Sequence, residues 1–149
     1  MKRIALVGAT GSIGRQTLQV ARERSYQVVA LAAGRDKEQL KRQIEEFQPE
    51  AAALFDEEAG RALAEELRDS GTQVFWGTEG VCKVAAWESA TMTVNAAVGI
   101  AGLRPTLAAL QAGKTLALAN KESLVCAGEI VMALAKEKNL EILPVDSEH

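Results

Sequence analysis

Seven residues near the start of the chain, Gly8-Ala9-Thr10-Gly11-Ser12-Ile13-Gly14, have the pattern of a loop that binds a pyrophosphate. The first glycine permits a tight turn, and the second lets the backbone approach a phosphate without a Cβ in the way. The third allows a helix to pack closely on a strand. Free N–H groups at the start of that helix favour an anion by about 0.3–1 kcal/mol per unit charge at an exposed site.

The context of this loop strengthens an otherwise weak motif. The spacing is GxxGxxG rather than the commoner GxGxxG, and a structural turn between strand and helix is the alternative. The loop follows an apolar run at residues 3–7 and precedes a pattern of helical period at residues 13–23. This placement inside a strand–helix–strand unit favours dinucleotide binding.

The end of the second apolar run, Gly34-Arg35-Asp36, indicates which dinucleotide is bound. Enzymes that prefer NAD usually have an acidic residue here that binds the ribose hydroxyl, whereas this chain places Arg35 21 positions after Gly14. A guanidinium can make a forked contact with a 2′-phosphate, worth about 1.5–3 kcal/mol. The sequence therefore predicts NADPH. The alternative is that Arg35 is solvated and Asp36 only caps the next helix.

Two further polar segments follow strand-like runs. Asn120, Lys121 and Glu122 leave an apolar run just before a helical pattern, where they could bind a ligand or form an ordinary capping turn. Asp146 and Glu148 stand two positions apart, so in an extended segment both carboxylates point the same way and could hold one hard cation. Magnesium and manganese want about six oxygen ligands, so the remainder must come from elsewhere. A solvated acidic segment is the alternative.

The elements that must position these residues alternate regularly along the chain. Mostly apolar strands are typical of a sheet covered on both faces. We therefore expect one domain over residues 1–149, of the α/β class, with a doubly wound, mostly parallel Rossmann-type sheet and helices on both faces. The expected strands are residues 3–7, 27–32, 51–55, 73–76, 92–95, 115–118 and 141–143, and the expected helices are 13–23, 37–47, 57–70, 103–111 and 123–138.

Composition narrows the class of protein. The 149 residues are 48% apolar and 25% charged, which is ordinary for a globular domain. A net charge of −3 argues against a nucleic-acid partner, and the sequence lacks the roughly 18 consecutive apolar residues of a membrane span. Cys82 and Cys126 form no CxxC pair, so we expect buried thiols, no disulfide or zinc site, and a reducing cytoplasm.

Two other classes of protein compete with a dehydrogenase-like enzyme. Short-chain reductases and sugar epimerases also open with Gly-Ala-Thr-Gly, but they need a Tyr-x-x-x-Lys pair for proton transfer. The only tyrosine, Tyr26, has Ala30 at the matching distance, which excludes that class. A stand-alone nucleotide-binding module without catalysis stays open.

Five segments together resemble the 1-deoxy-D-xylulose 5-phosphate reductoisomerase family. They lie in the order expected of that family, with Asn-Lys-Glu-Ser and Asp-Ser-Glu-His among them; two small departures are Ala at position 9, where Ser is common, and Arg at position 35, where some members have Lys. The five segments are residues 8–14, 33–36, 95–103, 119–125 and 144–149.

The resemblance implies an activity. Members of this family rearrange 1-deoxy-D-xylulose 5-phosphate, a small phosphorylated sugar, and reduce the product with NADPH to 2-C-methyl-D-erythritol 4-phosphate in non-mevalonate isoprenoid biosynthesis. They use a divalent metal, Mg or Mn. The resemblance also implies a homodimeric parent with catalytic and carboxyl-terminal domains beyond this chain, so we expect these residues alone to be inactive.

The resemblance also implies roles for individual residues. Lys121, Asp146 and Glu148 match catalytic positions, and Asp146 and Glu148 match metal ligands. Lys121, Ser147 and Glu148 match substrate contacts. The positions that match cofactor contacts are Thr10, Gly11, Ser12, Ile13, Gly34, Arg35, Asp36, Asn120 and Glu122, to which the loop pattern itself adds Gly8 and Gly14.

Overall fold

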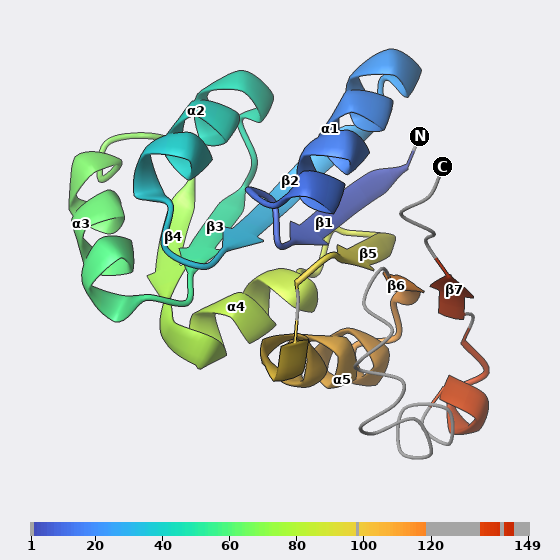
Figure 1. Ribbon diagram of the computed structural model, residues 1–149. Coiled ribbons are helices and arrows are strands. Elements are labelled where there is room, and N and C mark those ends of the chain that lie inside the picture. The colour runs from blue at the N-terminus through green and yellow to red at the C-terminus, as the bar shows by residue number, and fades with distance from the viewer. Residues whose placement is uncertain (1, 98, 119–134, 141, 145–149) are drawn as a thin grey trace.

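A single twisted sheet forms the centre of the molecule (Figure 1). The computed structural model describes residues 2–97, 99–118, 135–140 and 142–144. Seven strands lie in the order β4-β3-β2-β1-β5-β6-β7, and every pair of neighbours is parallel. The doubly wound prediction is therefore confirmed. The strands are β1 (Arg3–Val7), β2 (Gln27–Ala33), β3 (Ala51–Leu54), β4 (Gln73–Trp76), β5 (Met92–Asn95), β6 (Thr115–Leu118) and β7 (Ile142–Pro144).

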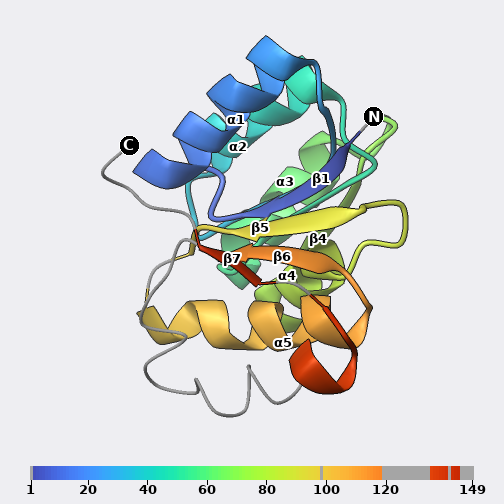
Figure 2. The same cartoon turned by 90° about the vertical axis from the view of Figure 1, so that its right-hand side faces the viewer.

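Helices cover both faces of this sheet (Figure 2). Helices α1, α2 and α3 form one layer, and α4 and α5 form the other. A short 3-10 turn, η1, precedes α5. The bounds are α1 (Ser12–Arg24), α2 (Lys37–Phe47), α3 (Glu57–Glu66), α4 (Gly77–Ala85), η1 (Gly99–Gly102) and α5 (Leu103–Gln111).

The alternation of side chains along β1 explains the two layers. Ile4 and Leu6 point to one face and pack in a buried cluster with Leu18 of α1. Ala5 and Val7 point to the opposite face and belong to a second buried cluster with residues of α4 and α5. Each strand of this kind is apolar on both sides, which is why the sequence shows nearly continuous apolar runs.

Helix α4 was missed by the sequence analysis, which placed no helix between β4 and β5. Its nine residues include Gly77 and Gly80, and each glycine lowers helix propensity by about 1 kcal/mol relative to alanine. Val81 and Val84 are fully buried against the sheet, so tertiary packing stabilises the helix. Helix α3 also ends at Glu66, four residues earlier than expected, and most of the helix expected over 123–138 lies outside the described residues.

The strand order places a crevice beside β1. The chain moves outward in one direction from β1 to β4 and in the other direction from β5 to β7. The loops that leave the carboxyl ends of β1 and β5 therefore diverge to opposite faces of the sheet. Such a switch point is where open α/β sheets bind their ligands.

Candidate functional site

The glycine loop is held tightly at the carboxyl end of β1. Gly8 has a φ of +86°, which favours glycine, and a Cβ on it would lie 2.6 Å from the carbonyl carbon of Ala96. The N–H groups of Gly8 and Ala9 both donate to the carbonyl oxygen of Ala32, at 2.8 and 2.9 Å. The first glycine thus makes the turn that the sequence predicted, wedged against the loop that follows β5.

The other two glycines of the loop differ in what surrounds them. A Cβ on Gly14 would lie 2.1 Å from the carbonyl oxygen of Gly8, so α1 can pack directly on the loop only with glycine there. A Cβ on Gly11 would have only the same oxygen, at 3.6 Å, within 4 Å. Its backbone is therefore open to a ligand. Both geometries agree with the sequence prediction.

The amino end of α1 has no capping side chain, unlike two neighbouring helices. Its N-cap is Gly11, without a side-chain hydrogen bond, and its first turn has no acidic residue. In contrast, Asp36 caps α2 through the N–H of Gln39 at 3.1 Å, and Asp56 caps α3 through the N–H of Ala59 at 2.8 Å. The first N–H groups of α1 therefore keep their partial positive charge available for an anion.

A cavity of about 250 Å³ opens beside these groups. It combines the glycine loop with the carboxyl ends of β2 and β5, as expected at the switch point. Its walls are mostly small and apolar, which leaves room for a ligand along the backbone. The sequence predicted Gly8, Thr10, Gly11 and Gly34 as cofactor contacts. Ala33, Ala96, Ala97 and Ala101 fall in segments 33–36 and 95–103, which were singled out without a role for these alanines. Phe55 was missed, and its position just after a strand is the one signal that could have found it.

The loop after β5 is fixed by a buried amide. Asn95 is fully buried, and its Nδ2 donates to the carbonyl oxygen of Gly102 and to Oγ1 of Thr106, both at 2.8 Å. Its Oδ1 accepts the N–H of Ala97 at 3.1 Å. These bonds hold the wall of the cavity that faces the glycine loop.

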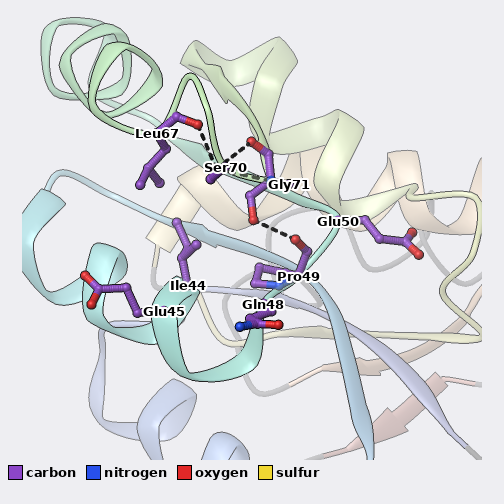
Figure 3. Close-up of a pocket in the computed structure, with 9 residues that line it drawn as sticks. Ile44, Glu45, Gln48, Pro49, Glu50, Leu67, Ser70 and Gly71 are labelled. Carbon is purple, nitrogen blue, oxygen red and sulfur yellow. Dashed lines mark hydrogen bonds between the residues drawn. The ribbon is translucent and has the colours of Figure 1, made fainter.

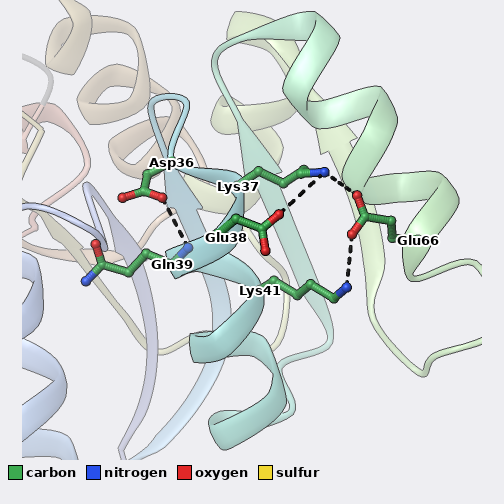
Figure 4. Close-up of polar contacts among 6 residues, drawn as sticks. All are labelled: Asp36, Lys37, Glu38, Gln39, Lys41 and Glu66. Carbon is green, nitrogen blue, oxygen red and sulfur yellow. Dashed lines mark hydrogen bonds and ion pairs between the residues drawn. The ribbon is translucent and has the colours of Figure 1, made fainter.

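Charged residues at the end of β2 fall into two groups. Arg35 and Asp36 are exposed, as is the neighbouring Gly34, and the Arg35 guanidinium makes no hydrogen bond or ion pair with the residues that the structure describes. Lys37 and Lys41 instead bind the carboxylate of Glu66 on α3 (Figure 4). Hydrogen bonds from these lysines lower the pKa of Glu66 and raise the pKa of each lysine. Arg35 thus remains available for a phosphate, while Asp36 also serves as the helix cap that the sequence left open.

A larger cavity, of about 500 Å³, lies at the opposite side of the sheet, where the strands begin (Figure 3). We call this side the amino edge, and the side where the strands end the carboxyl edge. Two of the cavity's polar side chains bind nearby backbone. Ser70 Oγ donates to the carbonyl oxygen of Leu67, and Thr72 Oγ1 donates to that of Pro49, both at 2.7 Å. Because these groups bind the protein itself, we regard this cavity as structural.

Other features of the described residues bear on the alternatives. Cys82 is half-buried rather than buried, and burial raises the pKa of its thiol, so it is a weak nucleophile. Among residues 2–97, 99–118, 135–140 and 142–144, no cluster of acidic, His or Cys side chains could hold a metal, and no helix is long and apolar enough to cross a membrane.

Several predicted site residues and Cys126 lie outside the described residues. The site residues are Asn120, Lys121, Glu122, Asp146, Ser147 and Glu148. Their roles stay predictions.

Comparisons with known proteins agree with this geometry. A family model described as 1-deoxy-D-xylulose 5-phosphate reductoisomerase matches residues 4–128. The reductoisomerase of Caldanaerobacter subterraneus subsp. tengcongensis is 50% identical over 151 residues, which cover 100% of this chain and 39% of that protein.

Solved structures give the same result. The reductoisomerase from Zymomonas mobilis in complex with NADPH matches with a TM-score of 0.91 and 39% identity, over 99% of this chain and 39% of that one. A DOX-P reductoisomerase in complex with NADPH, fosmidomycin and magnesium matches with a TM-score of 0.93 and 39% identity, over 100% of this chain and 37% of that one.

The match extends along the chain but not along its relatives. The chain spans about 40% of the length of the curated relatives it matches. Because the family model covers most of its residues, the chain belongs to the 1-deoxy-D-xylulose 5-phosphate reductoisomerase family.

Proposed function

We propose that this chain is the NADPH-binding part of an enzyme that rearranges and reduces 1-deoxy-D-xylulose 5-phosphate to 2-C-methyl-D-erythritol 4-phosphate. The observation that carries the proposal is the uncapped amino end of α1, which meets a glycine loop and an apolar cavity at the switch point. The family supports it, since relatives have been solved with NADPH.

The residues at hand fit this cofactor. Thr10, Ser12 and Ile13 offer their backbone N–H groups to the pyrophosphate. Gly11, whose own N–H donates to the carbonyl oxygen of Gly8 at 3.2 Å, lets the pyrophosphate approach because it has no Cβ. Arg35 offers a charged fork to the 2′-phosphate. The cavity walls at Ala96 and Ala97 exclude water from one side of the ligand. When bound, NADPH supplies a hydride to the substrate.

The remaining roles rest on the family and on residue chemistry. We propose that Asn120 and Glu122 contact the cofactor and that Lys121 and Ser147 bind the phosphorylated sugar. Asp146 and Glu148 would hold a divalent cation, since carboxylate oxygens suit Mg²⁺ and Mn²⁺. A solved relative contains magnesium. The homodimer and the cytoplasmic location stay predictions.

Calorimetry with NADPH and NADH tests the proposal. The wild-type chain should bind NADPH more tightly than NADH. Arg35→Leu should weaken NADPH binding by about 10- to 100-fold, the equivalent of a lost charge-assisted hydrogen bond, and leave NADH binding unchanged. Arg24→Leu, at the far end of α1, is the matched control and should bind both as wild type does.

Two results would contradict these assignments. An unchanged preference in Arg35→Leu would reject the role of Arg35. Failure of the wild-type chain to bind either nucleotide would reject the cofactor site itself. Nucleotide binding together with no reductoisomerase turnover by the full-length protein would instead favour a non-catalytic binding module.

A further inference from the structure

A buried glutamine connects α2 to the glycine loop. Gln43 is 7% exposed, and its Nε2 donates to the carbonyl oxygen of Ala9 at 3.0 Å. The two residues are 34 positions apart in sequence, and Ala9 lies between the first two glycines of the loop. The bond therefore fixes the orientation of a peptide unit inside the candidate phosphate-binding segment.

The geometry of that peptide unit determines where its other polar group points. A trans peptide is planar, and its C=O and N–H groups point in opposite directions. No described peptide is cis, so the N–H of Thr10 points away from the carbonyl of Ala9. Because that carbonyl faces Gln43 on α2, the N–H of Thr10 points away from α2. Thr10 also lines the cavity.

The second polar atom of Gln43 indicates what the bond is for. Its Oε1 is buried and has no hydrogen-bond partner among the described residues. An unpaired buried acceptor is unfavourable, so it offsets what the bond to Ala9 contributes to folding. The bond therefore adds little net stability, and its main effect is on the position of the loop.

We infer that Gln43 is a positioning residue that directs the N–H of Thr10 toward the cofactor's pyrophosphate. It touches no cofactor and acts only through the peptide between Ala9 and Thr10. The inference rests on the proposed NADPH site. It also makes α2, and not only α1, a determinant of pyrophosphate binding.

Two ligands separate this role from a structural one. NADPH has a pyrophosphate, whereas adenosine 2′-monophosphate has the adenosine and the 2′-phosphate without it. Gln43→Met keeps the length of the side chain and removes the donor. It should weaken NADPH binding about tenfold, the equivalent of one hydrogen bond. Binding of adenosine 2′-monophosphate and the melting temperature should not change. Gln16→Met, on the exposed face of α1, is the matched control.

A second variant tests the donor itself. Gln43→Glu keeps the shape, but an ionised carboxylate cannot donate to the Ala9 carbonyl, so NADPH binding should fall at least as far. Normal NADPH binding by either variant, or equal weakening of both ligands, would overturn the inference. If a variant does not fold, nitrogen-15 NMR of the wild-type chain decides. The Thr10 amide signal should shift with NADPH and stay unchanged with adenosine 2′-monophosphate, and the opposite result would overturn the inference.

The two proposals fail in different ways. A wild-type chain that binds no NADPH would overturn the proposed function and this inference together. If Gln43→Met binds NADPH as tightly as the wild-type chain does, only the inference about Gln43 would be overturned.

Discussion

The amino edge of the sheet and the glycine loop at its carboxyl edge treat their backbone groups in different ways. At the amino edge, side chains bind the backbone: Lys114 Nζ donates to the carbonyl oxygens of Glu88 and Ala90, at 2.9 and 2.8 Å. At the glycine loop of the carboxyl edge, glycines and alanines line the cavity and α1 starts without a cap, whereas Asp36 and Asp56 cap α2 and α3 at the same edge. Both regions belong to one sheet. We conclude that the candidate ligand site is the place where main-chain N–H groups have no partner within the described part of the protein and can bind another molecule.

Two charged residues, Glu50 at the amino edge and Arg35 at the carboxyl edge, show the same difference. Glu50, just before β3, accepts hydrogen bonds from Trp87 Nε1 at 2.8 Å and from Ser89 Oγ at 2.6 Å. These donors lower the pKa of its carboxyl. At the other edge Arg35 has no such partner among the described residues. The charge of Glu50 is thus used for structure, whereas the charge of Arg35 stays available.

The largest effect that separates the two edges should come from adding one methyl group at each edge, by replacing a glycine with alanine. In Gly14→Ala the new Cβ would meet backbone atoms of Gly8 and Ala9 at 2.1–2.9 Å. We expect the free energy of unfolding to fall by about 1–3 kcal/mol, as in overpacked cores, and NADPH affinity to fall about 100-fold or more. Gly71→Ala, at the amino edge with nothing within 4 Å, should change neither quantity.

Urea unfolding and calorimetry on both variants measure these effects. Normal NADPH binding by Gly14→Ala would show that close packing of α1 on the loop is unnecessary for the site.

Removing the amino-edge lysine should have a smaller effect, confined to stability. Lys114 is 9% exposed, and burial lowers its pKa. Lys114→Met leaves two carbonyls without their donor, so we expect a loss of about 1–3 kcal/mol in the free energy of unfolding. NADPH affinity of the folded variant should stay within about twofold of wild type, because the site lies at the other edge. Exposed Lys138→Met is the control. A loss of NADPH affinity without a loss of stability would contradict the separation of the edges.

The smallest expected effect is a pH dependence at Glu50. Its folded pKa is lowered, so its contribution to stability is complete above the ordinary glutamate pKa of about 4.3 and is lost as the pH falls through the lowered value. Glu50→Gln lacks this titration. The stability difference between wild type and variant should therefore shrink on acidification, in urea unfolding curves from neutral to acid pH. A difference that stays constant over this range would reject the role of the ionised carboxylate.

Much of this arrangement could be predicted from the sequence because local patterns determine it. The expected β1 and β4–β6 strands, and helices α2 and α5, have the observed bounds, since apolar runs and helical periods reflect burial directly. The roles of Gly8 and Gly14 followed from the absence of a Cβ. Asp36 was expected either to bind cofactor or to cap a helix, and only coordinates could show that it caps.

The rest could not be predicted because it depends on contacts between distant segments. Helix α4 contains two glycines, and only burial against the sheet stabilises it. Gln43 looks like one of several polar residues on a helix until the fold places it beside Ala9. Phe55 carries no motif, and it lines the cavity only because four strands, β1, β2, β3 and β5, end together.

The central claim is that the bare carboxyl edge, and not the larger cavity at the amino edge, binds NADPH. Nitrogen-15 NMR of the chain titrated with NADPH tests it most directly. We expect saturable shifts of the backbone amide signals of Gly8, Thr10, Gly11 and Arg35, with those of Thr72 and Lys114 unchanged. Shifts centred on Thr72 and the amino edge, with the glycine loop unchanged, would contradict it.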